Sequence, residues 1–286
     1  MPIRYPDVLA LQEAGRAYAY TERDAILYAL GTGWGAEPAG EELPFIYEAG
    51  LRTVPTLATV VAWGAGVSTD RVGLNQALVL HVGEETILHR PLPPAATIRA
   101  DSSVVEVRDR GPERGAVVVR RTVLHDAADG EPIATLNRTI LARGDGGFGG
   151  PPDRTDATPV PPSRPPDEMF EVATRPDQAA LYRLCGDRNP LHIDPRRAAA
   201  AGFPGPILHG LCTYGITCRA VIATFCDYDP TRVLAHRVRF SSPVFPGDRL
   251  CVELWREGDE VRFEASVPQR NVKVIRDGRT LLQGAA

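Results

Sequence analysis

The sequence predicts an α+β chain made of two tandem copies of one fold, each an antiparallel sheet wrapped around a central helix. Three observations predict it. A proline-rich segment divides the chain near its middle, two short motifs recur at a nearly constant spacing, and each half places helical patterns ahead of alternating strand patterns. With 286 residues, 43% of them hydrophobic, the chain can bury one large core or two of ordinary domain size.

The dividing segment runs from Arg143 to Asp167 and begins with a glycine-rich stretch. Its composition cannot continue a helix or a central strand, and its prolines make an extended, semi-rigid tether. The sequence therefore predicts an N-terminal repeat over residues 1–143, a linker over 144–167 and a C-terminal repeat over 168–286. The linker prolines are Pro151, Pro152, Pro159, Pro161, Pro162, Pro165 and Pro166.

Two pairs of short motifs indicate a duplication. Leu27–Leu30 aligns with Leu181–Leu184, and Pro91–Ile98 aligns with Pro243–Leu250, at offsets of about 154 and 152 residues. A tandem duplication gives nearly equal offsets of this kind. Chance similarity of two short apolar motifs is the alternative, and the sequence leaves it open.

Helical patterns stand near the start and in the middle of each half. Thr21 and Asp24 have the spacing of a capping box that opens a helix ending near Leu30. Pro176–Leu184 is its counterpart in the second half. A longer helix is expected over about His209–Cys226, apolar nearly all round and therefore buried, and the first half offers the shorter Pro55–Trp63.

Alternating strand patterns follow the longer helix in each half. In the first half they are Ala77–Leu80, Val104–Val107, Val117–Val119 and Ile133–Leu136, and in the second half Leu234–Phe240, Leu250–Leu254 and Val261–Val267.

Composition and charge narrow the classes of partner. The formal net charge is −4, so no general attraction to nucleic acid or anionic membrane is expected. The five cysteines are odd in number and form no C-x-x-C pair, which indicates a reduced, intracellular protein. No stretch approaches the roughly 18 apolar residues needed to span a bilayer, the N-terminus lacks an apolar leader, and the C-terminus is not a Ser-Lys-Leu address. We expect a bacterial cytoplasmic protein.

Several segments of the chain resemble a known family. The segment Tyr182–Pro195, which contains Asp187-Arg188-Asn189-Pro190-Leu191-His192, is similar to the hydratase 2 motif of MaoC-like enoyl-CoA hydratases, and the match continues through Ala201–Phe203 and Pro206–Cys212. Other segments resemble the hydratase portion of the peroxisomal multifunctional enzymes of type 2. These are Tyr20–Gly31, Gly146–Gly150 and Pro243–Gly247.

The resemblance implies a double hot-dog fold in which only the second copy carries the catalytic motif. In agreement, Gly31–Pro38 contains neither histidine nor aspartate, so the first copy is expected to be catalytically empty. In the family the altered first copy makes room for bulky acyl chains, and the glycine-rich run between Gly31 and Pro55 is compatible with that.

The resemblance also implies roles for four residues. Addition of water to a double bond conjugated to a thioester needs a base, a proton for C2 and stabilisation of the thioester oxygen. Asp187 and His192 would be the acid and base pair, held by a loop because Asn189-Pro190 blocks an ordinary helix. Asn189 would orient the loop or the water. Gly210, at the start of the long helix, would donate its backbone N–H to the oxyanion.

Arginines near these residues are candidates for the CoA phosphates. Arg237 and Arg239 alternate on a predicted strand and share one face, and Arg183 and Arg188 stand beside the motif. A solvated strand face is an equal alternative for the first two.

Other chemistries fit the sequence less well. Asp187 could be a simple turn residue, and His209 is either part of the site or a buried histidine. A metal held by His192, Asp194 and His209 is disfavoured because Asp194 reads as the N-cap before Pro195. Cys185 has no reason for a depressed pKa. We expect no cofactor, and no role for the remaining histidines, His81, His89, His125 and His236.

The predicted activity is reversible hydration of a trans-2-enoyl-CoA to the (R)-3-hydroxyacyl-CoA, in fatty-acid or sterol side-chain metabolism. The resemblance carries the stereochemistry and an expected homodimer. Two other classes stay open, an acyl-CoA thioesterase of the same fold and a non-catalytic subunit that binds acyl thioesters.

Overall fold

The computed structural model describes residues 2–36, 40–153 and 161–284. Glu37 and Pro38 of the glycine-rich run, and residues 154–160 of the predicted linker, lie outside the described residues. The described linker residues form no helix or strand, as their composition predicts. In the same described ranges, no helix combines the length and the apolar character needed to cross a membrane.

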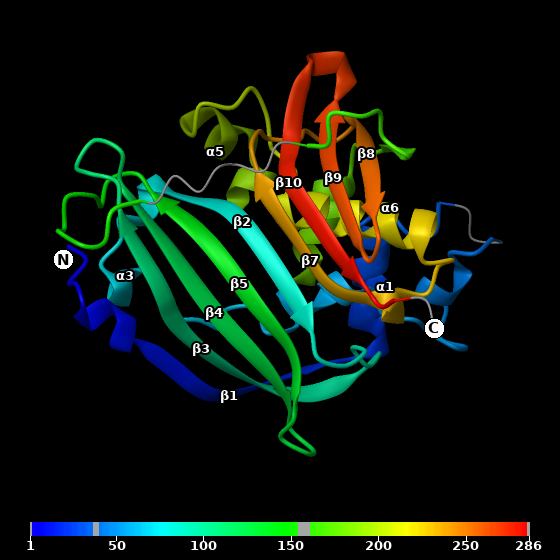
Figure 1. Ribbon diagram of the computed structural model, residues 1–286, viewed down its shortest axis with the longest axis horizontal. Helices are drawn as coiled ribbons and strands as arrows, with labels where there is room; N and C mark the ends of the chain where they lie inside the picture. Colours follow the sequence, from blue (N-terminus) through cyan, green and yellow to red (C-terminus); the bar gives the residue numbers. More distant parts are fainter. Residues whose placement is uncertain (1, 37–39, 154–160, 285–286) are drawn as a thin grey trace.

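Ten antiparallel strands form one continuous, strongly curved sheet (Figure 1). Its order is β1-β3-β4-β5-β2 in the first half and, read from the other edge, β6-β8-β9-β10-β7 in the second. The two halves therefore repeat one strand order and join where β2 pairs with β7, which confirms the predicted double fold. The first-half strands are β1 (Gln12–Tyr20), β2 (Val79–Leu88), β3 (Ala96–Asp109), β4 (Ala116–Asp126) and β5 (Pro132–Ala142). The second-half strands are β6 (Glu168–Ala173), β7 (Val233–Phe240), β8 (Arg249–Glu257), β9 (Glu260–Val267) and β10 (Val272–Leu282).

The helices lie mainly where the sequence predicts them. Both hydrogen bonds of the predicted capping box are present at Thr21 and Asp24, where α1 (Glu22–Gly31) begins. Its counterpart is α4 (Gln178–Tyr182), which a 3-10 turn extends to Cys185. The long helix is α6 (Gly210–Phe225), within one residue of the prediction at each end. The remaining short helices are α2 (Ala58–Val61), α3 (Thr69–Val72) and α5 (Pro195–Ala200).

The predicted helix over Pro55–Trp63 is wrong in length. A 3-10 turn over Pro55–Leu57 leads into α2, which is a single turn, and Ala62 leaves the helical region with φ −117° and ψ 44°. Three consecutive β-branched residues from Thr59 fit a helix poorly, and Gly64 follows with φ +86°. The first half therefore has no long helix to fill the inner face of its sheet.

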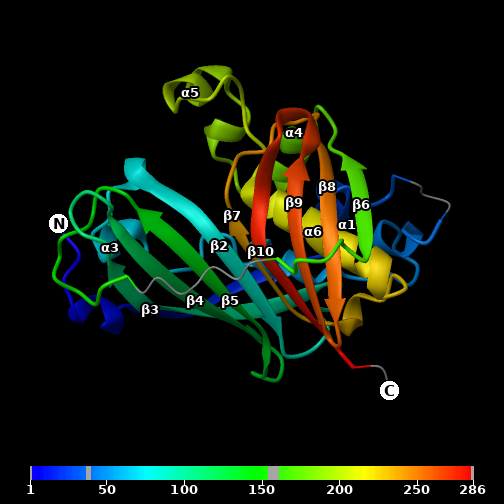
Figure 2. The same cartoon turned by 45° about the horizontal axis from the view of Figure 1, so that its top comes forward.

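Helix α6 is the centre of the second half. It lies against the inner face of β7–β10 (Figure 2), and its residues from Leu211 to Ile222 are buried. Gly215 allows α1 to approach, because a Cβ there would stand 2.4 Å from Thr32 Cγ2. The rings of Tyr28 on α1 and Tyr182 on α4 also meet, with centroids 5.9 Å apart. The start of α6 and the end of α4 are thus fixed next to each other, where the candidate site lies.

Candidate active site

A sharp turn after α4 places the predicted loop over the first half. Gly186 has φ +146°, and a Cβ at this position would lie 2.9 Å from Cβ of Trp63. Both the backbone conformation and the contact require glycine. Asp187 follows at once, so its position is set by how closely Gly186 packs on Trp63.

Hydrogen bonds within the loop explain its shape. The Asp187 Oδ1 accepts the N–H of Asn189 at 3.0 Å, and the Asn189 Oδ1 accepts the N–H of Leu191 at 3.0 Å. Asn189 therefore caps the 3-10 turn Pro190–His192 and orients the loop. Asp187 has the turn role that its sequence neighbours suggested, but only through one oxygen. Its other oxygen, Oδ2, faces His192.

Asp187 and His192 come together as the motif predicts. The His192 Nε2 is 3.9 Å from the Asp187 Oδ2, a separation at which both atoms can hydrogen-bond one water molecule. The His192 Nδ1 lies 2.8 Å from the carbonyl oxygen of Ile207. A carbonyl only accepts, so the proton sits on Nδ1 and Nε2 presents a lone pair toward Asp187. Burial lowers the pKa of His192, and this outweighs the opposing effects of Ile207 and Asp187.

Gly210 is the first residue of α6, directly after the histidine that stacks on His192. Within the described part of the chain, its backbone N–H donates to no protein acceptor, as expected in the first turn of a helix. A Cβ on Gly210 would lie 3.3 Å from the ring of Phe240. The N–H is therefore available to a ligand.

His209 contacts both Asp187 and His192. The sequence left open whether this histidine belongs to the site. Its ring stacks on His192 with centroids 3.7 Å apart, and its Nε2 lies 3.0 Å from the backbone oxygen of Asp187. Burial, and then the neighbouring His192, lower the pKa of His209 to about 4. A neutral His209 thus donates to the Asp187 carbonyl and holds the loop against the start of α6.

The structure groups Asp187, His192 and His209 with ligand-type atoms within 4.8 Å of one another. This differs from the set weighed in the sequence, because Asp194 instead caps α5 through the N–H of Arg196 at 2.9 Å. Two of the imidazole nitrogens are already committed to backbone carbonyls, and the two rings are stacked with 26° between their planes. Each ring therefore keeps a single nitrogen that could serve a metal ion.

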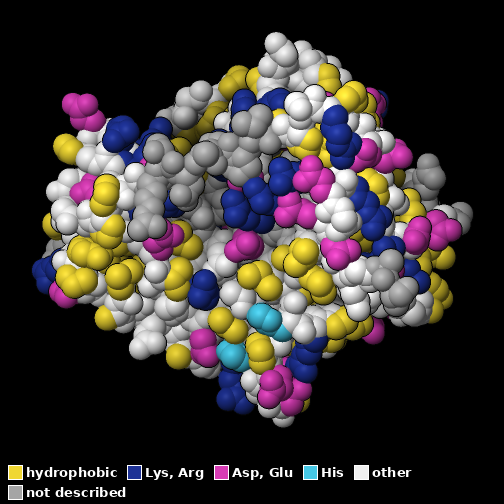
Figure 3. Space-filling view, in the orientation of Figure 1, with side chains coloured by type: hydrophobic (Ala, Val, Ile, Leu, Met, Phe, Trp, Pro, Cys, Tyr) yellow, Lys and Arg dark blue, Asp and Glu magenta, His cyan; other side chains and the backbone are white. Residues whose placement is uncertain are grey.

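The four candidate arginines lie in two places, two beside the candidate site and two on the outer face of β7. Arg183 is half-buried beside the site, and its charge contributes to the lowered pKa of His209, while Arg188 is exposed next to Asp187. Arg237 and Arg239 lie on the face of β7 opposite to His236 and Val238, which point toward α6. Arg237 bonds Asp277 at 2.8 Å there. Figure 3 shows acidic and basic side chains mixed over this outer face. Arg237 and Arg239 therefore lie on the face of β7 that points away from α6, and their role in binding the CoA phosphates stays a prediction.

The cysteines are free within the described residues. Burial, and then Asp24, raise the pKa of Cys185 to about 12, which removes it as a nucleophile.

In the first half, apolar and paired groups occupy the place that the catalytic loop takes in the second. After α1, Trp34 is buried and stacks on Phe45 with centroids 3.8 Å apart. Nearby, the Arg219 Nε donates to the Glu42 carboxylate at 2.6 Å, and both side chains are buried. The described part of the glycine-rich run is thus packed rather than open. Space in the first half arises instead beside the shortened α2.

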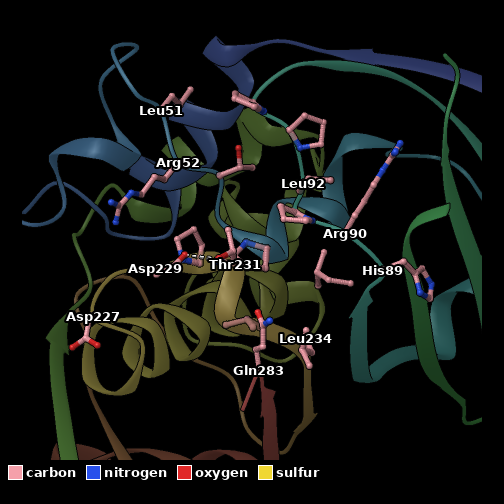
Figure 4. Close-up of a pocket in the computed structure, with 18 residues that line it drawn as sticks. Leu51, Arg52, His89, Arg90, Leu92, Asp227, Asp229, Thr231, Leu234 and Gln283 are labelled. Atoms are coloured by element: carbon pink, nitrogen blue, oxygen red, sulfur yellow. Dashed lines mark hydrogen bonds between the residues drawn. The ribbon is translucent and has the colours of Figure 1, made fainter. Parts of the chain in front are cut away.

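A large cleft lies elsewhere in the described part of the chain. It has a volume of about 950 Å³ and lies between Leu51–Pro55, the loop His89–Pro94 and the chain that follows α6 (Figure 4). Helix α6 spans about 24 Å from end to end, and the cleft is at the end opposite to Gly210. None of Asp187, His192 and Gly210 lines it.

Comparison with known proteins agrees with this geometry. Residues 157–277 match the MaoC-like domain, and residues 18–144 match the N-terminal domain of the MFE-2 hydratase 2. The chain is 38% identical to the enoyl-CoA hydratase ChsH3 of Mycobacterium tuberculosis, over 99% of both chains. The chain belongs to the MaoC-like hydratase family.

Further relatives extend this family likeness. The chain is 36% identical to the peroxisomal enoyl-CoA hydratase 2 of Arabidopsis thaliana, over 90% of this chain and 89% of that one. A MaoC-like dehydratase from Phytophthora capsici superposes with a TM-score of 0.88 at 33% identity, covering 99% of this chain and 100% of that one. A Mycobacterium tuberculosis protein described as a double hotdog fold matches at 16% identity with a TM-score of 0.57, over 96% of both chains, which supports the fold alone.

Proposed function

We propose that this MaoC-like hydratase adds water reversibly to trans-2-enoyl-CoA thioesters and forms (R)-3-hydroxyacyl-CoA. The observation that carries the proposal is the pair of the Asp187 carboxylate and the unprotonated His192 Nε2, 3.9 Å apart beside the free N–H of Gly210. Similarity to proteins named enoyl-CoA hydratase supports the substrate class, and the resemblance of the motif to the hydratase 2 family supports the (R) configuration.

Each group has a task in the proposed reaction. Asp187 and His192 hold one water between them, and the pair takes up one proton of that water as its oxygen bonds C3 of the substrate. The pair then delivers this proton to C2, so the net change is one water added, the pair returns to its starting state and the thioester bond stays intact. The N–H of Gly210, at the positive end of the α6 dipole, donates a hydrogen bond to the thioester oxygen and stabilises the negative charge that develops there. Reversal of these steps is dehydration.

No metal or other cofactor has a part in the proposal. The commitments of His192 and His209 to backbone carbonyls support this. We also propose a bacterial cytoplasmic location, supported by the free cysteines, and a homodimer, supported by the family resemblance. Light scattering of the purified protein tests the homodimer.

The assay uses crotonyl-CoA and longer trans-2-enoyl-CoAs. The conjugated absorbance should fall without release of free thiol, because water adds to the double bond and leaves the thioester. Release of thiol without 3-hydroxyacyl product would make the protein a thioesterase. No change in absorbance and no release of thiol at any chain length would favour a protein that binds acyl thioesters without catalysis.

Removal of one backbone donor tests the role of Gly210. Proline is tolerated at the first position of a helix, and His209 has φ −59° and ψ 135°, which suits the residue before a proline. Gly210→Pro should therefore keep α6 and lose only the N–H, with kcat falling by roughly 10²–10³. Gly210→Ala keeps the backbone N–H, so its kcat should fall less than that of Gly210→Pro. Equal kcat values for the two folded variants would remove Gly210 from the mechanism.

The pH profile tests the protonation state of His192. Because burial lowers its pKa, His192 stays neutral below the usual histidine value of about 6.5. We expect kcat/KM to hold from neutral pH through that value and to fall only at more acidic pH, as His192 gains a proton. An acid limb centred above the usual value would contradict the base assignment.

A further inference from the structure

A row of charged side chains crosses the inner face of the first-half sheet. Strands β2, β5 and β4 lie side by side in the sheet (Figure 1). Glu84 on β2 pairs in register with Arg138 on β5, and Arg138 pairs in register with Arg120 on β4. The row lies between two separate apolar clusters, one with Leu124 and Leu136 and the other with Val104 and Val118. An apolar core is therefore interrupted by charge at this one level of the sheet.

The charges of the row do not balance. Glu84 accepts from Arg138 Nε at 3.0 Å and lies 2.7 Å from His81 Nε2. Burial would raise the pKa of Glu84, but Arg138 and then His81 outweigh it, and the pKa is lowered. Glu84 and Arg138 thus neutralise each other. Arg120 is a second cation opposite Arg138, and like charges in this cross-strand position repel.

Arg120 has no counterion among residues 2–36, 40–153 and 161–284. Its Nε and Nη2 are buried and have no hydrogen-bond partner. Glu13 exerts a weak attraction on Arg120, but its carboxylate bonds Arg71 at 3.1 Å. Burial, and then Arg138, lower the pKa of Arg120 to about 10. A buried guanidinium with unmet donors is costly, and a bound anion relieves the cost.

A cavity lies at the row. It has a volume of about 50 Å³, and Arg120, Arg138 and Glu84 line it together with Trp63 and residues of α2. This volume admits a group as large as a few water molecules, which includes a carboxylate. The planar guanidinium fork of arginine matches a carboxylate with two parallel hydrogen bonds. The space lies beside α2, which is a single turn.

The cavity adjoins the catalytic loop. Trp63 lines the cavity and packs on Gly186, the residue before Asp187. The Arg138 guanidinium lies 5.7 Å from the Trp63 ring centroid, and the charge of Asp187 is among the groups that raise the pKa of Arg138. On the other side, His81 contacts the ring of Phe240, which lies against Gly210. Trp63 is therefore the wall that the cavity shares with the catalytic loop.

We propose that Arg120 is an anion-binding end of the acyl pocket, so that the enzyme prefers trans-2-enoyl thioesters whose acyl group carries a carboxylate remote from the thioester. The inference rests on the proposed hydratase function and names its substrate class.

Two sets of trans-2-enoyl-CoAs test the inference, one ending in a methyl group and one ending in a carboxylate, over the same series of chain lengths. The measured quantity is the ratio of kcat/KM for the carboxylate to that for the methyl compound. In the unmodified protein the ratio should exceed roughly ten at the length that spans from Asp187 to Arg120. Arg120→Met should lower the ratio roughly 10- to 100-fold.

Arg121→Met is the matched control. Arg121 is the next residue of the same strand, is exposed on the opposite face and bonds Asn137 at 2.9 Å. For the Arg121→Met variant, the ratio of kcat/KM for the carboxylate to that for the methyl compound should equal the ratio of the unmodified protein. Thermal unfolding of all three proteins verifies folding, and Arg120→Gln serves in place of methionine if Arg120→Met does not fold.

The outcomes separate the inference from the function on which it rests. Absence of crotonyl-CoA hydration by the unmodified protein would overturn the proposed function. Hydration of crotonyl-CoA with a ratio near one at every length would overturn the carboxylate subsite alone. A ratio unchanged in Arg120→Met, with thermal stabilisation of the unmodified protein by inorganic phosphate, would make Arg120 a structural ion site and also overturn the inference.

Discussion

Replacement of Asp187 by asparagine is expected to lower kcat for enoyl-CoA hydration by roughly 10²–10⁴, the range for loss of an acid or base group. Asparagine keeps a side-chain oxygen to accept the N–H of Asn189, so the loop should keep its turn. It removes the negative charge that faces His192 across 3.9 Å. The loss should therefore appear in kcat, with little change in the thermal unfolding temperature.

Asp194→Asn provides the control for this substitution. Asp194 caps α5 seven residues further along the chain, and asparagine is an equally good cap. Its kcat should match that of the unmodified protein. Near-normal turnover in a folded Asp187→Asn variant would show that another group handles the water.

His192→Gln is expected to have an effect of the same size, roughly 10²–10⁴ in kcat. The amide of glutamine cannot accept a proton from water at neutral pH, although its length allows a bond to the Ile207 carbonyl that holds His192. A fall in kcat without unfolding would assign the base. His125→Gln should leave kcat unchanged, because His125 lies on β4 and its ring contacts Asp101 instead of the candidate site.

The losses in kcat caused by Asp187→Asn and His192→Gln should not multiply in the double variant. If Asp187 and His192 act on one water, the double variant should be about as slow as the slower single variant. Multiplied losses in the double variant would mean that the two side chains act in separate steps.

The sequence predicted the second half well, because its signals are local. Asn189-Pro190 dictates the turn between Asp187 and His192, and the apolar run after Gly210 predicts a buried helix in any context. The motif likewise identified the pair that the structure brings together. Spacing could not reveal that His192 is held by the carbonyl of Ile207 or that His209 bonds the backbone of Asp187, because both depend on how the loop folds back on α6.

The first half was harder to predict because tertiary packing decides its details. Residues Pro55–Trp63 have a helical pattern, yet β-branched residues and the approach of Gly186 to Trp63 limit α2 to one turn. The sequence did not predict strands β1 and β6, because they are edge strands with mostly exposed side chains. It also did not predict β10, whose pairing with β9 shifts near Gly278. The charged row also has no sequence signature, since Glu84, Arg120 and Arg138 meet only through strand register.

The destination of the water oxygen tests the central proposal most directly. The unmodified protein is incubated with a trans-2-enoyl-CoA in heavy-oxygen water, and the products are examined by mass spectrometry. The account predicts one heavy oxygen in the C3 hydroxyl of an intact 3-hydroxyacyl-CoA. Heavy oxygen in the carboxyl group of a free acid, with CoA released, would contradict it.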